Sequence, residues 1–110
     1  MYQKELLKGN TETLILSLLA ENTMYGYQMV KEIEQRSSGY FLFKEGTLYP
    51  ALHRLEKSAL VHGQWKEIPN GVPRRYYRIT LKGEEVLSER MAEWRRFSTA
   101  VNLVMLPGTS

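Results

Sequence analysis

The pattern of apolar and polar positions along the chain predicts amphipathic helices in its first half and two strands after them. Apolar side chains first recur every three or four residues, as they do on the buried face of a helix. The first such stripe contains Leu6, Leu7, Leu14, Ile15, Leu18 and Leu19. The second, within MYGYQMVKEIEQRSSG, contains Gly26, Met29, Val30 and Ile33. We therefore expect two neighbouring helices joined by a short link, with Gly39 at the C′ position after the second.

The segment KEGTLYPALHRLEKSAL, residues 44–60, predicts a third helix that starts within two residues of Glu45. Pro50 is tolerated near its start, where backbone N–H groups have no intrahelical partner, and Glu45 and Thr47 are candidate caps. Its apolar face consists of Leu48, Ala51, Leu52, Leu55 and Ala59. The other face carries Tyr49, His53, Arg54 and Lys57, whose hydroxyl, imidazole and cationic groups suit a binding role. An ordinary amphipathic surface helix is the alternative interpretation.

Alternation with a period of two predicts a β-hairpin after this helix. Apolar and polar residues alternate in VHGQWK and again in RRYYRI, and Asn70-Gly71 between two prolines marks the chain reversal. Arg74 and Arg75 open the second strand and point to opposite faces, so one faces outward while the other packs or pairs with an acid. The aromatic residues expected to pack in the sheet and core are Trp65, Tyr76 and Tyr77.

A long last helix is predicted from about Lys82 to Leu106, with Thr80 as its N-cap and Pro107-Gly108 as its end. Such a helix is about 37 Å long at 1.5 Å per residue. That length exceeds the compact part of a domain whose expected radius of gyration is about 13 Å. We therefore expect its apolar stripe to meet a second copy of the chain, in an obligate homodimer. The expected interface contains Leu6, Leu7, Leu87, Met91, Trp94, Phe97, Val101 and Met105.

The charge distribution adds a second signal. The formal net charge is +3, but residues 44–82 carry eight basic and three acidic side chains, or +5, which leaves −2 for the rest of the chain. A basic middle between acidic flanks is the asymmetry of a nucleic-acid-binding face. On charge alone, a solvated surface with chance clustering is equally favoured.

Several function classes are disfavoured by what the 110 residues contain. The chain has no cysteine, which excludes disulfides and thiolate metal sites and fits a reducing compartment. The start has no signal-peptide pattern, and no stretch approaches the about 20 apolar residues of a membrane span, so we expect a cytoplasmic protein. His53 and His62 lack partners at metal-ligand spacing, and no phosphate loop or nucleophile motif occurs. We expect no catalytic residue, metal or cofactor.

Three helices followed by a hairpin make a winged helix-turn-helix, so the predicted fold is mainly α with a small β-hairpin. We assign residues 1–80 to this DNA-binding domain and residues 81–110 to a C-terminal dimerisation helix with a short tail. YGYQMVKEIE, EGTLYPALHRLEKSAL and RRYYRITLKGEEVL together resemble the PadR family of bacterial transcriptional regulators, over about Leu14 to Leu87. The resemblance implies a homodimer that binds palindromic operator DNA as a repressor of a nearby gene.

In that interpretation the third helix is the recognition helix, whose N-terminal half touches base edges. Thr47 and Tyr49 supply hydroxyl groups, Arg54 is the candidate reader of guanine, and Lys57 is a candidate phosphate contact. The predicted DNA contacts are Tyr27, Lys44, Thr47, Tyr49, His53, Arg54, Lys57, Arg74 and Arg75. The alternative function is a winged-helix protein-interaction module that does not bind DNA.

The last expectation concerns a ligand. The short chain with a single C-terminal helix is similar to the smaller PadR subgroup, which includes multidrug-responsive repressors. That similarity implies a planar hydrophobic effector near the dimer interface, with Met91 and Trp94 as its candidate contacts. The alternative is that Trp94 is simply part of the interface core.

Overall fold

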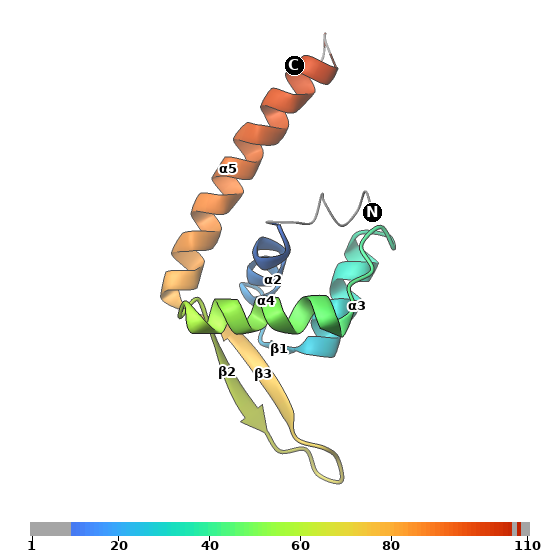
Figure 1. Ribbon diagram of the computed structural model, residues 1–110, viewed down its shortest axis with the longest axis vertical. Coiled ribbons are helices and arrows are strands. Elements are labelled where there is room, and N and C mark those ends of the chain that lie inside the picture. The colour runs from blue at the N-terminus through green and yellow to red at the C-terminus, as the bar shows by residue number, and fades with distance from the viewer. Residues whose placement is uncertain (1–9, 107, 109–110) are drawn as a thin grey trace.

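The computed structural model describes residues 10–106 and 108, and its elements follow the predicted order (Figure 1). Three helices form a bundle, the hairpin projects to one side of it, and the last helix leaves on the other side as a rod. The molecule accordingly measures 58 × 29 × 20 Å. This is a winged helix with a long C-terminal helix, as predicted. The elements are α2 (Thr11–Leu19), β1 (Met24–Tyr25), α3 (Gly26–Arg36), α4 (Glu45–Lys57), β2 (Val61–Lys66), β3 (Arg74–Ile79) and α5 (Leu81–Met105).

The core lies where α2, α3 and α4 bring their apolar stripes together. The side chains that are fully buried there are Ile15, Leu16, Met29, Leu48, Leu52 and Leu55. Most of them belong to the stripes expected from the sequence, and Leu16 is an addition. The extension of the first stripe to Leu6 and Leu7 lies outside the described residues. Burial on this scale, about 1.5–3 kcal/mol for each large apolar side chain, fixes how each helix is rotated about its axis.

The sheet has a third strand that the helical pattern concealed. Met24 and Tyr25 were expected in the second helix, but they pair antiparallel with Tyr77 and Tyr76 of β3, in the strand order β1-β3-β2. The helix starts only at Gly26, because the backbone N–H of Tyr25 is turned toward Gln28 Oε1, at 3.0 Å. The backbone groups of Met24 and Tyr25 are therefore used for pairing with β3 and for this bond to the Gln28 side chain, and not for a helix.

The helix ends also differ from the expectation in detail. After α3 the left-handed C′ residue is Ser38, with φ 53°, and Gly39 follows it, donating its N–H to Glu34 O at 2.7 Å. After α4 Ala59 takes the same position with φ 62°, which removes it from the apolar face and exposes it. The N-cap residue of α4 is Lys44, so the two predicted caps were wrong. Both C-terminal turns are closed by backbone bonds of the Schellman type.

Thr80 is the N-cap of α5, as predicted, and its Oγ1 accepts the N–H of Gly83 at 3.0 Å. The same hydroxyl donates to the carbonyl oxygen of Ala59 at 2.7 Å. The start of α5 is thus joined to the loop between α4 and β2.

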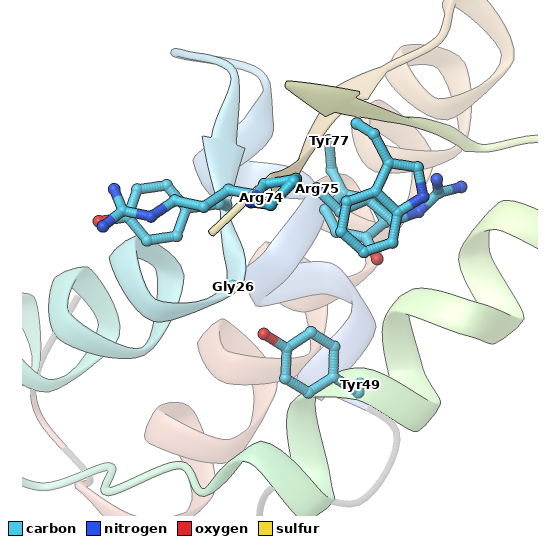
Figure 2. Close-up of a pocket in the computed structure, with 8 residues that line it drawn as sticks. Gly26, Tyr49, Arg74, Arg75 and Tyr77 are labelled. Carbon is cyan, nitrogen blue, oxygen red and sulfur yellow. The ribbon is translucent and has the colours of Figure 1, made fainter. Parts of the chain in front are cut away.

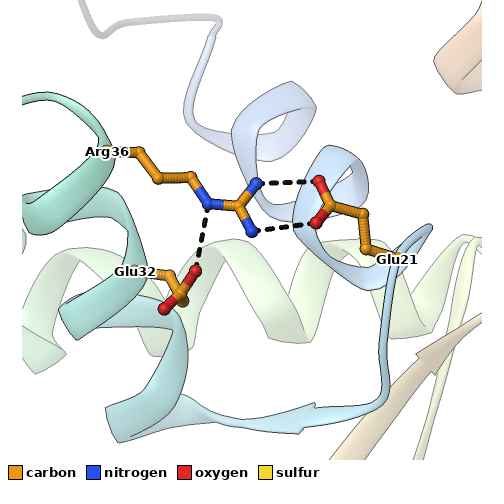
Figure 3. A network of polar contacts seen from close by, with 3 residues as sticks. All are labelled: Glu21, Glu32 and Arg36. Atoms are coloured by element: carbon orange, nitrogen blue, oxygen red, sulfur yellow. Dashed lines mark hydrogen bonds and ion pairs between the residues drawn. The ribbon is translucent and has the colours of Figure 1, made fainter.

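Arg36, the last residue of α3, forms an ion pair with Glu21, which follows the end of α2 (Figure 3). Its two terminal amino groups donate to the two carboxylate oxygens of Glu21 at 2.7 and 2.8 Å, while Nε donates to Glu32 at 3.0 Å. The bond from Arg36 lowers the pKa of the Glu21 carboxyl below its ordinary value, and the two acids raise the pKa of Arg36. The Arg36–Glu21 pair thus links the segment that follows α2 to the last turn of α3.

Gly83 provides a test of this packing. A Cβ at this position would overlap the carbonyl oxygen of Leu60 and lie 2.7 Å from Ile79 Cγ1. We expect Gly83→Ala to lower the free energy of unfolding by about 1–3 kcal/mol, because the crowded backbone must move. Gly46→Ala is the control, since nothing lies within 4 Å of its added methyl, and it should raise stability by up to about 1 kcal/mol. The free energies of unfolding are compared by urea denaturation at one protein concentration. Equal stability of the two variants would contradict the close packing of Gly83 against Leu60 and Ile79.

Candidate nucleic-acid interface

The recognition helix candidate, α4, divides its surface into an inner face, an outer face and two flanks. At about 100° per residue, the four buried residues Leu48, Ala51, Leu52 and Leu55 lie on one side. The exposed positions directly opposite them are Gly46, Pro50, His53 and Lys57. Tyr49 and Glu56 lie on the flank toward the sheet, whereas Thr47 and Arg54 lie on the flank toward α2. The burial of the apolar stripe therefore decides which polar groups face outward.

The flank toward the sheet meets the start of α3. A Cβ on Gly26 would lie 2.5 Å from Tyr49 Oη, so any larger residue at the start of α3 would require the Tyr49 ring to move. Farther along α4, Glu56 accepts hydrogen bonds from Arg75 Nη2 at 2.5 Å and from the backbone N–H of Gly63 at 3.3 Å. These contacts hold the hairpin against α4.

A hollow of about 390 Å³ opens where α3, α4 and the hairpin meet (Figure 2). In the close-up Tyr49 points from α4 toward Gly26, and the two arginines lie across from it on β3. The hollow is lined by Tyr25, Gly26, Tyr49, Trp65, Pro73, Arg74, Arg75 and Tyr77. It unites three predicted DNA contacts, Tyr49, Arg74 and Arg75, with aromatic rings that the sequence did not indicate as part of a site.

The two wing arginines diverge as the strand alternation predicts. The half-buried Arg75 is paired with Glu56 and lies over the rings of Trp65 and Tyr77, 5.7 and 5.6 Å from their centroids. Arg74 is exposed and stacks on the ring of Tyr25 at 4.4 Å. No acid is paired with Arg74 among residues 10–106. Arg75 therefore serves the fold of the wing, and Arg74 keeps its positive charge available.

The aromatic residues of the hairpin only partly follow the expectation. Tyr77 is buried as predicted, and this burial raises the pKa of its hydroxyl. Tyr76 is half-buried and packs edge-on against Tyr25, with centroids 5.3 Å apart. Trp65 is 64% exposed, so the prediction of a core position was wrong. The reason is its register opposite Arg75, beyond the end of the part of the sheet that covers the core.

Comparison with known proteins agrees with this arrangement. The model of the PadR-like transcriptional regulator family matches residues 15–89. The chain belongs to the PadR-like family. A transcriptional regulator from Clostridium thermocellum superposes with a TM-score of 0.84 at 34% identity, over 92% of this chain and 98% of that one. A PadR-like regulator from Bacillus cereus gives a TM-score of 0.81 at 35% identity, over 93% and 97%. A Mycobacterium tuberculosis transcriptional regulator is 34% identical over 86 residues, 78% of this chain and 77% of that protein.

PadR-like proteins are transcriptional regulators and not enzymes. Within the described part of the chain, no group of three or more histidine or acidic side chains has a geometry that could hold a metal ion. The same residues contain no helix that is long and apolar enough to cross a membrane.

The remaining predicted DNA contacts of this PadR-like chain lie outside the hollow. Tyr27 is exposed in the first turn of α3, where Lys31 lies 5.5 Å from its ring centroid. Lys44 is exposed at the start of α4. Arg54 lies on the flank toward α2, where its Nε donates to Glu12 Oε2 at 2.9 Å. The structure therefore gathers Tyr49 and the wing arginines at the hollow and places the other predicted contacts elsewhere on α3 and α4.

The predicted dimer stripe on α5 separates into two parts. Leu87 is 7% exposed and belongs to the core of its own chain, so it is not part of an outward stripe. Beyond it, Met91, Trp94, Phe97 and Met105 are exposed and Val101 is half-buried. The rings of Trp94 and Phe97 lie 5.9 Å apart, and a shallow hollow of about 410 Å³ follows toward the C-terminus. Its lining is Phe97, Ala100, Val101, Val104 and Met105.

Proposed function

We propose that this PadR-like regulator is a repressor that binds a palindromic operator as a homodimer, in the cytoplasm. The observation that carries the DNA-binding part is the outer face of α4 with the wing beside it. His53 and Lys57 lie on that face, and Arg74 extends the positive charge onto the hairpin. Neither Lys57 nor Arg74 is paired with an acid within the described residues. These cations suit a polyanion, because neutralising DNA phosphates releases condensed counterions.

The groups around α4 fall into two kinds of contact. The cations Lys44, Lys57 and Arg74 suit contacts with DNA phosphates. Such contacts fix the orientation of the protein on DNA but do not read the base sequence. Thr47, Tyr49 and His53 offer hydrogen-bonding groups near the start and middle of the helix, where base edges are reached. Arg54 is the guanine reader in this scheme. Tyr27 is placed to contact DNA phosphates from α3, whereas Arg75 acts indirectly, by holding the wing against α4.

The dimer part of the proposal rests on the far half of α5. Exposed apolar side chains line this half, and it extends away from the rest of the chain. In aqueous solution an apolar stripe of this length is removed from water when it packs against a second helix with the same kind of stripe. We assign residues 1–80 to DNA binding and residues 81–110 to dimerisation. Two copies then present two recognition helices about 34 Å apart, one DNA turn, to successive major grooves.

The first prediction concerns the outer face. Lys57→Ala should weaken binding to all DNA sequences alike and reduce the slope of log K against log salt by about 0.9, the value for one phosphate. Arg95→Ala is the control, because it removes the same charge from an exposed position on α5. Gel shifts with the region upstream of the protein's own gene, repeated at several salt concentrations, provide the measurement. Equal effects of the two variants would show that the face is misassigned.

The same experiment separates the two candidate functions. A winged-helix module that binds only proteins shows no salt-sensitive, sequence-selective retardation of this DNA.

The second prediction concerns the dimer. Val104→Asp should convert the protein to a monomer of 12.8 kDa, because a carboxylate cannot be buried in an apolar seam without a partner. Leu81→Asp is the matched control, since the exposed fractions of Val104 and Leu81 are 80% and 79%. The two positions lie about 35 Å apart along the helix. Sedimentation equilibrium at micromolar concentration decides, and a monomeric wild type excludes the homodimer.

The third prediction concerns an effector. We propose that Met91 and Trp94 line a site for a planar hydrophobic molecule at the dimer interface, where an adaptable methionine suits varied ligands. A planar aromatic dye should quench the fluorescence of the wild type and of Trp65→Phe, but not of Trp94→Ala. The dye should also weaken DNA binding by linkage. If quenching persists in Trp94→Ala, or if no dye quenches the fluorescence, the effector site is contradicted and Trp94 is part of the interface core only.

A further inference from the structure

The side chain of Glu12 connects three helices, α2, α4 and α5. Its carboxylate lies in the first turn of α2, between an arginine of α4 and an arginine of α5. Glu12 Oε2 lies 2.9 Å from Arg54 Nε, and Glu12 Oε1 lies 3.7 Å from Arg90 Nη1. The Glu12 side chain is only 26% exposed, whereas that of Arg54 is 58% exposed. The acid is therefore shielded between the helices, and the guanidinium of Arg54 reaches past it into solvent.

The geometry of the Arg54–Glu12 pair leaves the two terminal amino groups of the arginine unpaired within the described residues. Arg54 donates to Glu12 through Nε. Nη1 and Nη2 have no hydrogen-bond partner within the described residues. Those two amino groups form a fork that matches the O6 and N7 acceptors of guanine in the major groove. A carboxylate on Nε fixes the plane of the guanidinium without occupying this fork.

We propose that Glu12 is a positioning residue for base recognition, which orients Arg54 so that its terminal amino groups read a guanine. The inference rests on the proposed DNA-binding function. An arginine loses much rotamer freedom when it docks, and a pre-ordered side chain loses less of it on binding. Because Glu12 holds the guanidinium on the flank of α4, Arg54 is also less able to swing onto a neighbouring phosphate. Glu12 thus favours the guanine contact over sequence-independent contacts.

Arg90 completes the arrangement from α5. At 3.7 Å from Oε1 it contacts the carboxylate oxygen that Arg54 does not use. It balances part of the negative charge and limits rotation of the Glu12 side chain. The position of Arg54 therefore depends on α5 as well as on α2 and α4.

The test compares Glu12→Gln with the matched control Glu45→Gln in the full-length protein. Glu45 is exposed in the first turn of α4 and has no ion-pair partner within the described residues, so both variants remove one negative charge near the interface. A library of randomised duplexes is first enriched with the wild type. Affinities are then measured by fluorescence anisotropy for the preferred duplex and for each single base-pair change. The variants Arg54→Ala and Arg54→Lys are measured in the same way, together with the double variant that combines Arg54→Ala with Glu12→Gln.

We expect Arg54→Ala and Arg54→Lys to relax discrimination at one G·C pair by about 5- to 150-fold. Glu12→Gln should relax discrimination at that same pair by about two- to fivefold, the range of an exposed ion pair. In the Arg54→Ala background, Glu12→Gln should have no further effect on discrimination at that pair. Glu45→Gln should leave discrimination unchanged, although both glutamine variants raise affinity for all duplexes by a similar factor. Circular dichroism and thermal unfolding confirm that each variant is folded.

Four outcomes overturn the inference. Glu12→Gln with wild-type discrimination shows that the carboxylate does not position Arg54. Relaxation at a different base pair, or an effect of Glu12→Gln on discrimination that persists in Arg54→Ala, shows that Glu12 acts through another group. If the wild type enriches no sequence while binding DNA nonspecifically or not at all, the proposed operator-binding function fails, and the inference fails with it.

Discussion

The burial of one face of α4 is the constraint on which the rest of the interface depends. Leu48, Ala51, Leu52 and Leu55 are all within 1% of complete burial, so the helix cannot rotate without exposing them. That rotation places Lys57 outward, Tyr49 toward the sheet and Arg54 toward α2. Each flank is then secured by a polar contact, Glu56 with Arg75 on one side and Glu12 with Arg54 on the other. Ion pairs that remain partly exposed to water add little stability, and the role of these two is orientation.

The wing is held by a different balance of forces. Its base, at Val61 and Tyr77, is buried in the core, whereas Trp65 farther along the hairpin is exposed. Arg75 links this part of the wing to α4, because its guanidinium pairs with Glu56 and lies 5.7 Å from the centroid of the Trp65 ring. A cation that is paired and stacked in this way is a structural element. The neighbouring Arg74 stacks only on Tyr25 and keeps a net charge for a partner.

The periodicity of the sequence predicted the four helical stripes and the hairpin, because apolar spacing reports directly on burial. It failed where tertiary pairing overrides local pattern. Met24 and Tyr25 directly precede the stripe of the second helix and were assigned to that helix, yet they pair with β3, which no local signal marks. Trp65 fits the alternation of a buried strand, but it lies past the edge of the core. The alternation correctly separated Arg74 from Arg75, whereas the pairing of Arg54 with Glu12, 42 residues away, has no local signal at all.

The start of α5 determines what a partner on its far end can do to α4. Thr80 bonds to Ala59, Lys82 Nζ donates to the carbonyl oxygen of Ser58 at 3.2 Å, and Leu87 is buried in the core. Ser58 and Ala59 directly follow the last residue of α4. The first turns of α5 and the end of α4 therefore move as one body, and the far half of α5 acts as a rigid arm of that body. In a dimer joined through these arms, a change in the angle between them changes the separation of the two recognition helices. In that proposed dimer the same motion acts on Arg90, which lies 3.7 Å from Glu12, so the proposed helix spacing and the proposed guanine contact of Arg54 share one set of contacts.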